Sequence, residues 1–280
     1  MNTVTDFAFK QRKYMPTFPI AHGKPTIYIE GYPYEDDEPM PATASDNGWH
    51  GLQINIFYDQ LFRYFRINEY VHIGNDNFIY YEEGDLTKVV APDIFIVFGV
   101  KKYPLRRSFY TWSEGAVPVA VFEFLSDATA GQDRHEKVQV YLKEIGVQEF
   151  FIHQPEMDKP AEFFGWRRCA SGDIVDIVPD AAGGLFSEAL NLWFRWEDQL
   201  DTHVRLLRPS LPDGTPINTS VEEEHLREQE QHLRMEAEAR AEEAEARAEE
   251  AEMQVREESE RRQALETELE RLRAQLPKRS

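Results

Sequence analysis

The chain has 280 residues, of which 41% are hydrophobic and 12% aromatic, so it carries enough apolar side chain for a folded core and is not a wholly disordered protein. Its formal net charge is −20, and both the part before Val221 and the part from Val221 onward are acidic, which excludes a large basic face that would bind nucleic acid or anionic lipid by charge alone. The single cysteine, Cys169, excludes an internal disulfide and a cysteine-based zinc site.

The sequence contains no uncharged apolar stretch of about 18 residues that could span a membrane. Its first 20 residues also lack the sustained apolar segment of a secretory signal. We therefore expect a cytoplasmic protein without membrane partners.

Residues 1–46 are rich in proline, glycine and acids and are expected to form an irregular lead-in. Ser45 or Asp46 is placed to cap a helix that starts near Trp49. The apolar positions of this helix follow the i, i+3, i+4, i+7 spacing of one buried face: Ile54, Phe57, Tyr58, Leu61 and Phe65.

The middle of the chain combines strand-like runs with one helix. Strands are expected at 77–83, 90–100, 117–126 and 149–155. Residues 131–146 predict a helix between the last two, with an apolar stripe of Val138, Tyr141, Leu142 and Ile145, and with Gly146 placed to end it. Strand, helix and strand form a crossover unit, so we expect an α/β fold with a mixed sheet, flanked by helices, in a core of roughly 150 residues.

Further strands are expected at 161–168, 173–179, 192–197 and 203–207, followed by a linker at 209–220. From 221 to 276 the sequence predicts one long helix. The motif AEARAEE at 237–243 recurs unchanged at 244–250, and apolar residues keep the 3,4 spacing of a coiled-coil seam: Ala241, Ala244, Ala248, Ala251, Val255, Leu265, Leu269, Leu272 and Leu276. Two alternatives remain open: a coiled coil that makes the protein a homo-oligomer, or a lone charged helix in solvent.

Two acids stand in strands that are expected to be buried. Glu123 lies in the middle of the apolar run VAVFEFLS, and Asp93 follows Pro92 directly before five apolar residues. Burying a carboxylate without a partner costs several kcal/mol. A divalent cation shared by both acids would remove this cost, because Mg²⁺ and Mn²⁺ prefer hard oxygen ligands. In the simpler alternative, Asp93 caps a turn and Glu123 pairs with an arginine.

An ordered set of short motifs then points to a family. The sequences APD (91–93), VFEFLS (121–126) and GVQEFF (146–151), with the D…K…Y pattern of Asp133, Lys137 and Tyr141, resemble the restriction endonuclease family of the Uma-two type within the PD-(D/E)XK nuclease superfamily. The resemblance runs from about Trp49 to Leu207. It implies a restriction-endonuclease-like domain at 47–208 and Mg²⁺-dependent cleavage of DNA.

The resemblance also implies roles for individual residues. Asp93 and Glu123, with the backbone carbonyl of Phe124, would bind Mg²⁺ or Mn²⁺. The position two residues after Glu123 holds Leu125, where the superfamily motif has a lysine, and Lys137 on the following helix would take the place of that lysine.

Spacing gives limited support to this assignment. Asp133, Lys137 and Tyr141 lie at i, i+4 and i+8 and so line one side of the helix. We expect Ser126, Asp133 and Tyr141 to orient the site. The alternative for Lys137 is an ion pair with Asp133 on a solvated face.

Two further features are candidates for the site. The segment KKYPLRRSFYTW (101–112) mixes aromatic residues with four cations that could contact DNA phosphates, Lys101, Lys102, Arg106 and Arg107, or could form a solvated loop. His50, at the start of the first helix, could face the metal or could be a capping or surface histidine.

The sequence thus predicts a Mg²⁺-dependent deoxyribonuclease. The alternative from another class is a catalytically inactive nuclease fold that acts as a binding or assembly module through its C-terminal helix. A two-carboxylate glycosidase would explain neither the lysine nor the coupled strands.

Overall fold

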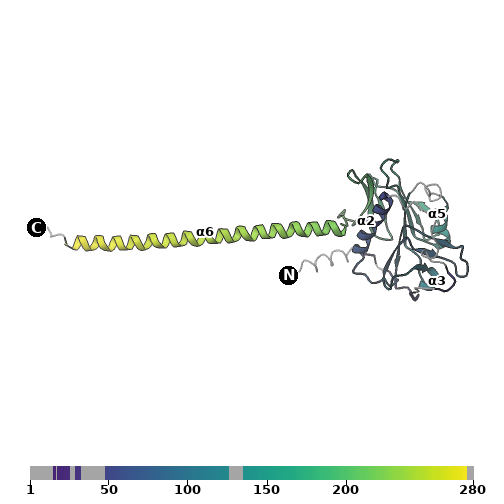
Figure 1. Cartoon of the computed structure of the whole chain (residues 1–280), viewed down its shortest axis with the longest axis horizontal. Helices are drawn as coiled ribbons and strands as arrows, with labels where there is room; N and C mark the ends of the chain where they lie inside the picture. Colours follow the sequence, from purple (N-terminus) through teal and green to yellow (C-terminus); the bar gives the residue numbers. More distant parts are fainter. Residues whose placement is uncertain (1–14, 17, 26–28, 33–47, 126–134, 276–280) are drawn as a thin grey trace. The chain divides into compact units, whose positions relative to one another are not determined.

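The structure, a computed structural model, describes residues 15–16, 18–25, 29–32, 48–125 and 135–275, with side chains up to Arg271 in the last helix. The chain divides into two compact units, Met1–Ser220 and Val221–Ser280, and each is described by itself. The mixed α/β architecture with a long C-terminal helix is confirmed (Figure 1).

A six-stranded mixed sheet forms the centre of the first unit. Its strands are ordered β1-β4-β6-β7-β8-β9. β6 and β7 are parallel and every other neighbouring pair is antiparallel. The strand bounds are β1 Val71–Asn75, β4 Ile94–Phe98, β6 Ala120–Phe124, β7 Glu149–His153, β8 Phe163–Arg168 and β9 Ile174–Asp176.

Helix α2 (Gly48–Tyr64) covers one face of this sheet. Four of its predicted core residues are buried, and Tyr58 is half-buried. The ring of Phe57 lies 4.8 Å from the ring of Phe122 in β6. The i, i+3, i+4 pattern therefore identified the correct helix and its buried side.

The opposite face is covered by the predicted crossover helix (Figure 1). It consists of α5 (Glu136–Gln139) and the π-helical η3 (Val140–Ile145), and it ends at Gly146, whose φ is 85°. The predicted apolar stripe is buried. Successive side chains along β6 alternate between the two faces of the sheet. Phe122 and Phe124 pack in the cluster that contains α2, whereas Val121 and Leu125 pack in the cluster that contains η3.

Two three-stranded sheets complete the first unit. One has the order β3-β2-β5 and the other β10-β11-β12. Their elements are β2 Phe78–Tyr80, β3 Val89–Val90, β5 Ser108–Tyr110 followed by α3 Thr111–Glu114, β10 Leu185–Ser187, β11 Leu192–Gln199 and β12 Val204–Ser210.

Sequence patterns missed β1, β5 and β10, which have three to five residues each. β1 also contains Gly74, which weakens a strand pattern. Tertiary packing explains this glycine, because a Cβ there would lie 1.9 Å from the ring of Phe95 on β4.

The described part of the lead-in packs on the core without forming a helix or strand. Ala21 N donates to Gly99 O at 2.9 Å, and Lys24 N donates to Ser113 O at 3.0 Å. The ring of Phe18 stacks on Phe98 with 4.2 Å between centroids.

The segment predicted as a linker, 209–220, is also part of the folded unit. It begins within β12, and Leu211 and Ile217 are buried. Asp59 of α2 accepts hydrogen bonds from Ser220 N and Oγ, both at 2.6 Å. The first unit is therefore fastened up to the residue where the last helix begins.

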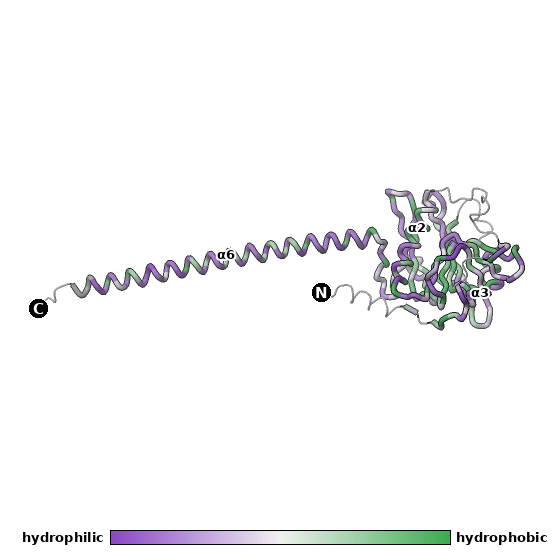
Figure 2. The backbone as a smooth tube through the Cα atoms, turned by 60° about the horizontal axis from the view of Figure 1, so that its bottom comes forward, coloured by the Kyte–Doolittle hydropathy of each residue, from purple (hydrophilic) through white to green (hydrophobic). Residues whose placement is uncertain are grey.

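Helix α6 (Ser220–Gln275) is continuous over 56 residues. Figure 2 shows hydrophilic colours along most of its length, interrupted by apolar positions. Among the residues that the structure describes, no helix combines the length and the apolar character needed to cross a membrane.

Candidate metal centre

The candidate site lies where β4 begins and β6 ends. These strands are antiparallel, with Ile94 opposite Phe122, so Asp93 comes beside the last residues of β6. Asp93 and Glu123 are both buried. The sheet therefore brings two acids that are 30 positions apart in the sequence to one end of two neighbouring strands.

The side chain of Asp93 accepts a hydrogen bond from the backbone at the end of β6. Its Oδ2 accepts from Phe124 N at 2.6 Å. The same oxygen lies 3.3 Å from Nε2 of His50. Asp93 thus ties the end of β6 to the first turn of α2.

His50 sits between Asp93 and the carbonyl that was predicted as a metal ligand. Its Nε2 lies 3.0 Å from Phe124 O. A carbonyl only accepts, so Nε2 carries the proton in this arrangement and has no lone pair to offer a metal. His50 is buried, and among the described residues its Nδ1 has no hydrogen-bond partner. The histidine is therefore not a surface residue, and in this arrangement its Nε2 is not a metal ligand.

The electrostatics of His50 favour its protonated form. Burial lowers the pKa of the imidazole, but the hydrogen bond and negative charge of Asp93, the carbonyl of Phe124 and the charge of Asp76 outweigh it and raise the pKa. Asp76 was not predicted as a site residue. It follows β1, and its N donates to Asp93 O at 3.3 Å, a long-range contact that no local pattern indicates.

Glu123 has partners on the crossover helix, whereas Asp93 has His50 of α2 as a partner. Oε1 of Glu123 accepts from Tyr141 OH at 2.7 Å and lies 3.0 Å from Nζ of Lys137. The lysine side chain is 25% exposed, whereas that of Glu123 is 5% exposed. The predicted shared side of Lys137 and Tyr141 thus faces the strand acid. Tyr141 lies in the π-helical η3, a form that often occurs at functional sites.

Two predicted site residues, Ser126 and Asp133, lie outside the described residues. The contact between Lys137 and Glu123 shows that the lysine does not face solvent alone.

The predicted DNA-contact segment divides into buried and exposed cations. Nζ of Lys102 donates to the carbonyls of Phe65 at 3.0 Å and Arg66 at 3.2 Å, and lies 5.0 Å from the ring centroid of Phe62. Burial lowers the pKa of this lysine, with Glu69 opposing the effect. Lys102 therefore fastens the end of the first helix and does not belong to a surface patch.

Arg106 is likewise internal. Its Nε and Nη2 donate to the two carboxylate oxygens of Glu114 at 2.6 and 2.9 Å, and both side chains are 1% exposed. The prediction that Lys102 and Arg106 contact DNA phosphates is therefore wrong, because both cations bind partners inside the fold. Lys101 and Arg107 are exposed and remain predictions.

Another buried acid, Glu149, lies at the other end of the central strands. Glu149, opposite Ala120, accepts from Arg167 Nε at 2.7 Å, from Glu188 N at 3.0 Å and from Ser187 Oγ. Burial raises the pKa of this carboxyl, although its hydrogen bonds oppose the effect. These donors join β7, β8 and β10, so Glu149 is a structural acid.

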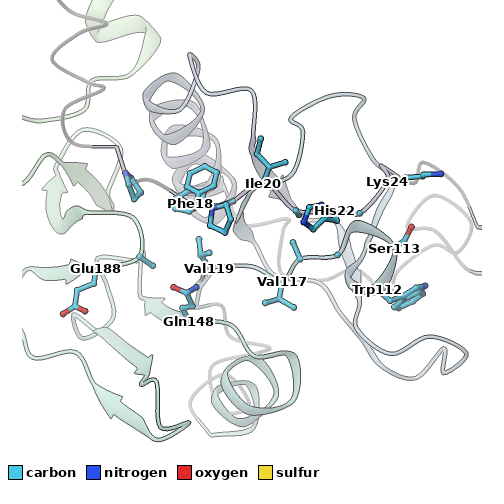
Figure 3. A pocket seen from close by; sticks show the side chains of 18 residues that line it. Phe18, Ile20, His22, Lys24, Trp112, Ser113, Val117, Val119, Gln148 and Glu188 are labelled. Atoms are coloured by element: carbon cyan, nitrogen blue, oxygen red, sulfur yellow. The ribbon is translucent and has the colours of Figure 1, made fainter.

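A cleft of about 1190 Å³ also lies away from the two acids (Figure 3). Phe18, Ile20, Val117, Val119 and Gln148 are among its lining residues. Val119 precedes the first residue of β6, whereas Glu123 lies near its last. Asp93, Glu123 and Lys137 do not line this cleft, so the candidate chemistry lies elsewhere.

The oxygens of the site suit a hard cation only in part. Asp93 Oδ2 and Phe124 O both lie within 3.3 Å of His50 Nε2, so they converge on one point. In the described part of the chain, no three histidine, cysteine, aspartate or glutamate side chains form a group that could hold a metal ion. A cation bound here would use the carbonyl together with the carboxylates and would require the imidazole to move away.

Comparisons with known proteins add little to this geometry. No family model matches the sequence, and no curated protein matches it significantly. Among solved structures, a DUF820 protein from Anabaena variabilis that is provisionally described as a nuclease is similar at 18% identity and a TM-score of 0.35, over 53% of this chain and 78% of that chain. A TM-score this low does not establish a shared fold.

Proposed function

We propose that the chain is a metal-dependent endonuclease that hydrolyses DNA phosphodiester bonds. Asp93, Glu123 and the carbonyl of Phe124 would hold Mg²⁺ or Mn²⁺, and Lys137 would assist. The observation that carries this proposal is the position of two buried acids at the adjoining ends of β4 and β6, with a lysine 3.0 Å from one of them.

The donor set supports a hard cation. All three proposed ligand atoms are oxygens, which Mg²⁺ and Mn²⁺ prefer. Burial of two carboxylates is costly unless positive charge compensates it. Lys137 compensates Glu123, and the imidazole of His50, whose pKa is raised, lies 3.3 Å from Asp93. The ring of His50 thus occupies the point at which a cation would meet Asp93 and Phe124 O.

Each residue then has a task in hydrolysis. When bound, the cation would polarise the phosphoryl group and lower the pKa of a coordinated water. Lys137 would hold positive charge near the non-bridging phosphate oxygens, where negative charge increases in the transition state. Tyr141 orients Glu123 through its 2.7 Å hydrogen bond.

The proposed substrate follows from the motif resemblance and not from surface charge. The chain carries a net charge of −20, so DNA would bind through the metal and a few local cations and not through a broad basic face. Lys101 and Arg107 are the exposed cations of the 101–112 segment that could contribute.

A catalytically inactive binding or assembly module is the second candidate. The observation that favours it is that protein donors already satisfy the acids: Phe124 N and His50 at Asp93, and Tyr141 and Lys137 at Glu123. A site fully satisfied by its own protein donors does not require a metal to be stable.

The test combines metal binding with cleavage. Thermal unfolding of the full chain would be followed during titration with Mn²⁺, because a ligand that binds the folded form raises the melting temperature. Cleavage would be assayed on single-stranded, duplex and branched DNA. The variants are Asp93→Asn and Glu123→Gln, with Glu136→Gln, an exposed acid beside Lys137, as the matched control.

A nuclease predicts a thermal shift and cleavage that both variants lose and that Glu136→Gln keeps. Cleavage that survives in both Asp93→Asn and Glu123→Gln would refute the metal site. A folded protein with neither a thermal shift nor cleavage would favour the assembly module.

A further inference from the structure

Helix α6 carries an exposed apolar seam. Val255, Leu265 and Leu269 are 69%, 59% and 53% exposed. The sequence fits one heptad frame, written abcdefg. Its a positions include Ala241, Ala248, Val255 and Leu269, and its d positions include Ala237, Ala244, Ala251 and Leu265. Such an a/d seam on a helix is typical of a coiled coil.

Between residues 240 and 266 the charges that flank this seam are segregated by sign, and Glu268 at the following g position departs from the pattern. The g positions hold Arg240, Arg247 and Arg261. The e positions five residues later hold Glu245, Glu252 and Glu266. This arrangement is independent of the apolar seam and bears directly on which helix could pair with it.

Pairing geometry decides between the two possible orientations. In a parallel, in-register pair, a g residue meets the e′ residue five positions later in the partner, so each of the three arginines meets a glutamate. In an antiparallel pair, g meets g′ and e meets e′, which would set arginine against arginine and glutamate against glutamate. A slip of one heptad would put Arg247 opposite Ser259 instead of Glu252.

We propose that α6 binds α6 of a second copy of this chain in a parallel, in-register coiled coil. The leucines and Val255 supply the apolar burial, and the e/g charges select the orientation and the register. In this pairing both copies of α6 run in the same direction, so the two Ser220 residues lie at the same end of the helix pair. This inference does not depend on the proposed nuclease activity.

One polar interruption weakens the seam, because a parallel, in-register pair sets like charges against each other at these two core positions. Glu258 falls at d and Arg262 at a, and Nε of Arg262 donates to Glu266 at 3.4 Å within the single helix. Polar core positions lower the stability of a coiled coil while fixing its register. Replacing both with leucine should therefore tighten dimerisation several-fold.

The first experiment places one cysteine on the full chain in a Cys169→Ser background. Ala244→Cys lies at d, and Ala246→Cys, two residues away at f, is the matched control. Under mild oxidation, the parallel arrangement predicts a covalent dimer for Ala244→Cys and none for Ala246→Cys. A non-covalent dimer in which Ala244→Cys does not cross-link would overturn the parallel arrangement.

The second experiment reverses charge and follows mass by analytical ultracentrifugation. Replacing Glu245, Glu252 and Glu266 at the e positions with arginine should weaken dimerisation by roughly tenfold or more, since each attractive pair becomes repulsive. Arginine at the b positions Glu242, Glu249 and Glu270 makes the same change in net charge away from the seam and should leave the dimer intact. A monomer, a trimer or a tetramer of the unmodified chain at tens of micromolar would overturn the proposal, as would equal effects of the two sets.

Discussion

Replacing His72 with phenylalanine should make the folded unit less sensitive to acid. His72 lies in β1 and is 4% exposed. Its ring stacks on Phe109 with 5.7 Å between centroids. Burial, with the nearby charge of Arg106, lowers its pKa to about 3.

The sign and size of the effect follow from linkage. A histidine whose folded pKa is lowered stabilises the fold above its unfolded pKa of about 6.5, and this stability is lost as the pH falls toward 3. Between pH of about 7.5 and about 5, only the unfolded chain takes up this proton, which costs about 2 kcal/mol of unfolding free energy. His72→Phe keeps the aromatic stacking and removes this titration.

Urea denaturation at both pH values measures the effect. The loss of unfolding free energy on acidification should be smaller by about 2 kcal/mol in His72→Phe than in the parent chain. His135→Phe, which removes an exposed histidine of the same unit, is the control and should retain the parent's loss. An equal loss in the parent and in His72→Phe would show that His72 is not held neutral in the folded unit.

Three further predictions concern the buried charges and the site. Arg106→Met should cost about 3–5 kcal/mol of unfolding free energy in urea, since it removes the guanidinium that pairs with the buried carboxylate of Glu114; an equal cost for exposed Arg107→Gln would contradict this. Lys137→Met should lower DNA cleavage by about 10²–10³-fold while the Mn²⁺-induced thermal shift persists, and unchanged cleavage would exclude the catalytic role. His50→Ala should enlarge that thermal shift by freeing the oxygens; a smaller shift would instead make the histidine a ligand.

Much of the fold could be predicted because its elements follow local periodicity. The i, i+3, i+4 pattern gave α2 and its buried side, and the strand, helix and strand order gave the parallel β6–β7 pair. The sequence patterns missed the short strands because these hold few residues. β1 also contains a glycine that only the ring of Phe95 explains. The π-helical form of η3 also left no local signal.

The candidate site was predicted only in part. The rule that a buried acid needs a partner singled out Asp93 and Glu123 from the sequence. This rule did not give their partners: Lys137 and Tyr141 were expected from the family resemblance and the helix spacing, and His50 of α2 was one of two alternatives.

The sequence by itself determined the helices and the longer strands and which acids had to be compensated, since periodicity and the cost of a buried charge are local properties. Only the tertiary structure decided which charges are used internally. Lys102 and Arg106 are as polar as their exposed neighbours Lys101 and Arg107, but both are buried. Lys102 binds carbonyls just after α2, and Arg106 binds the carboxylate of Glu114. The fate of a charged side chain depends on the partners that folding brings to it, and those partners are distant in sequence or set by the turn between them.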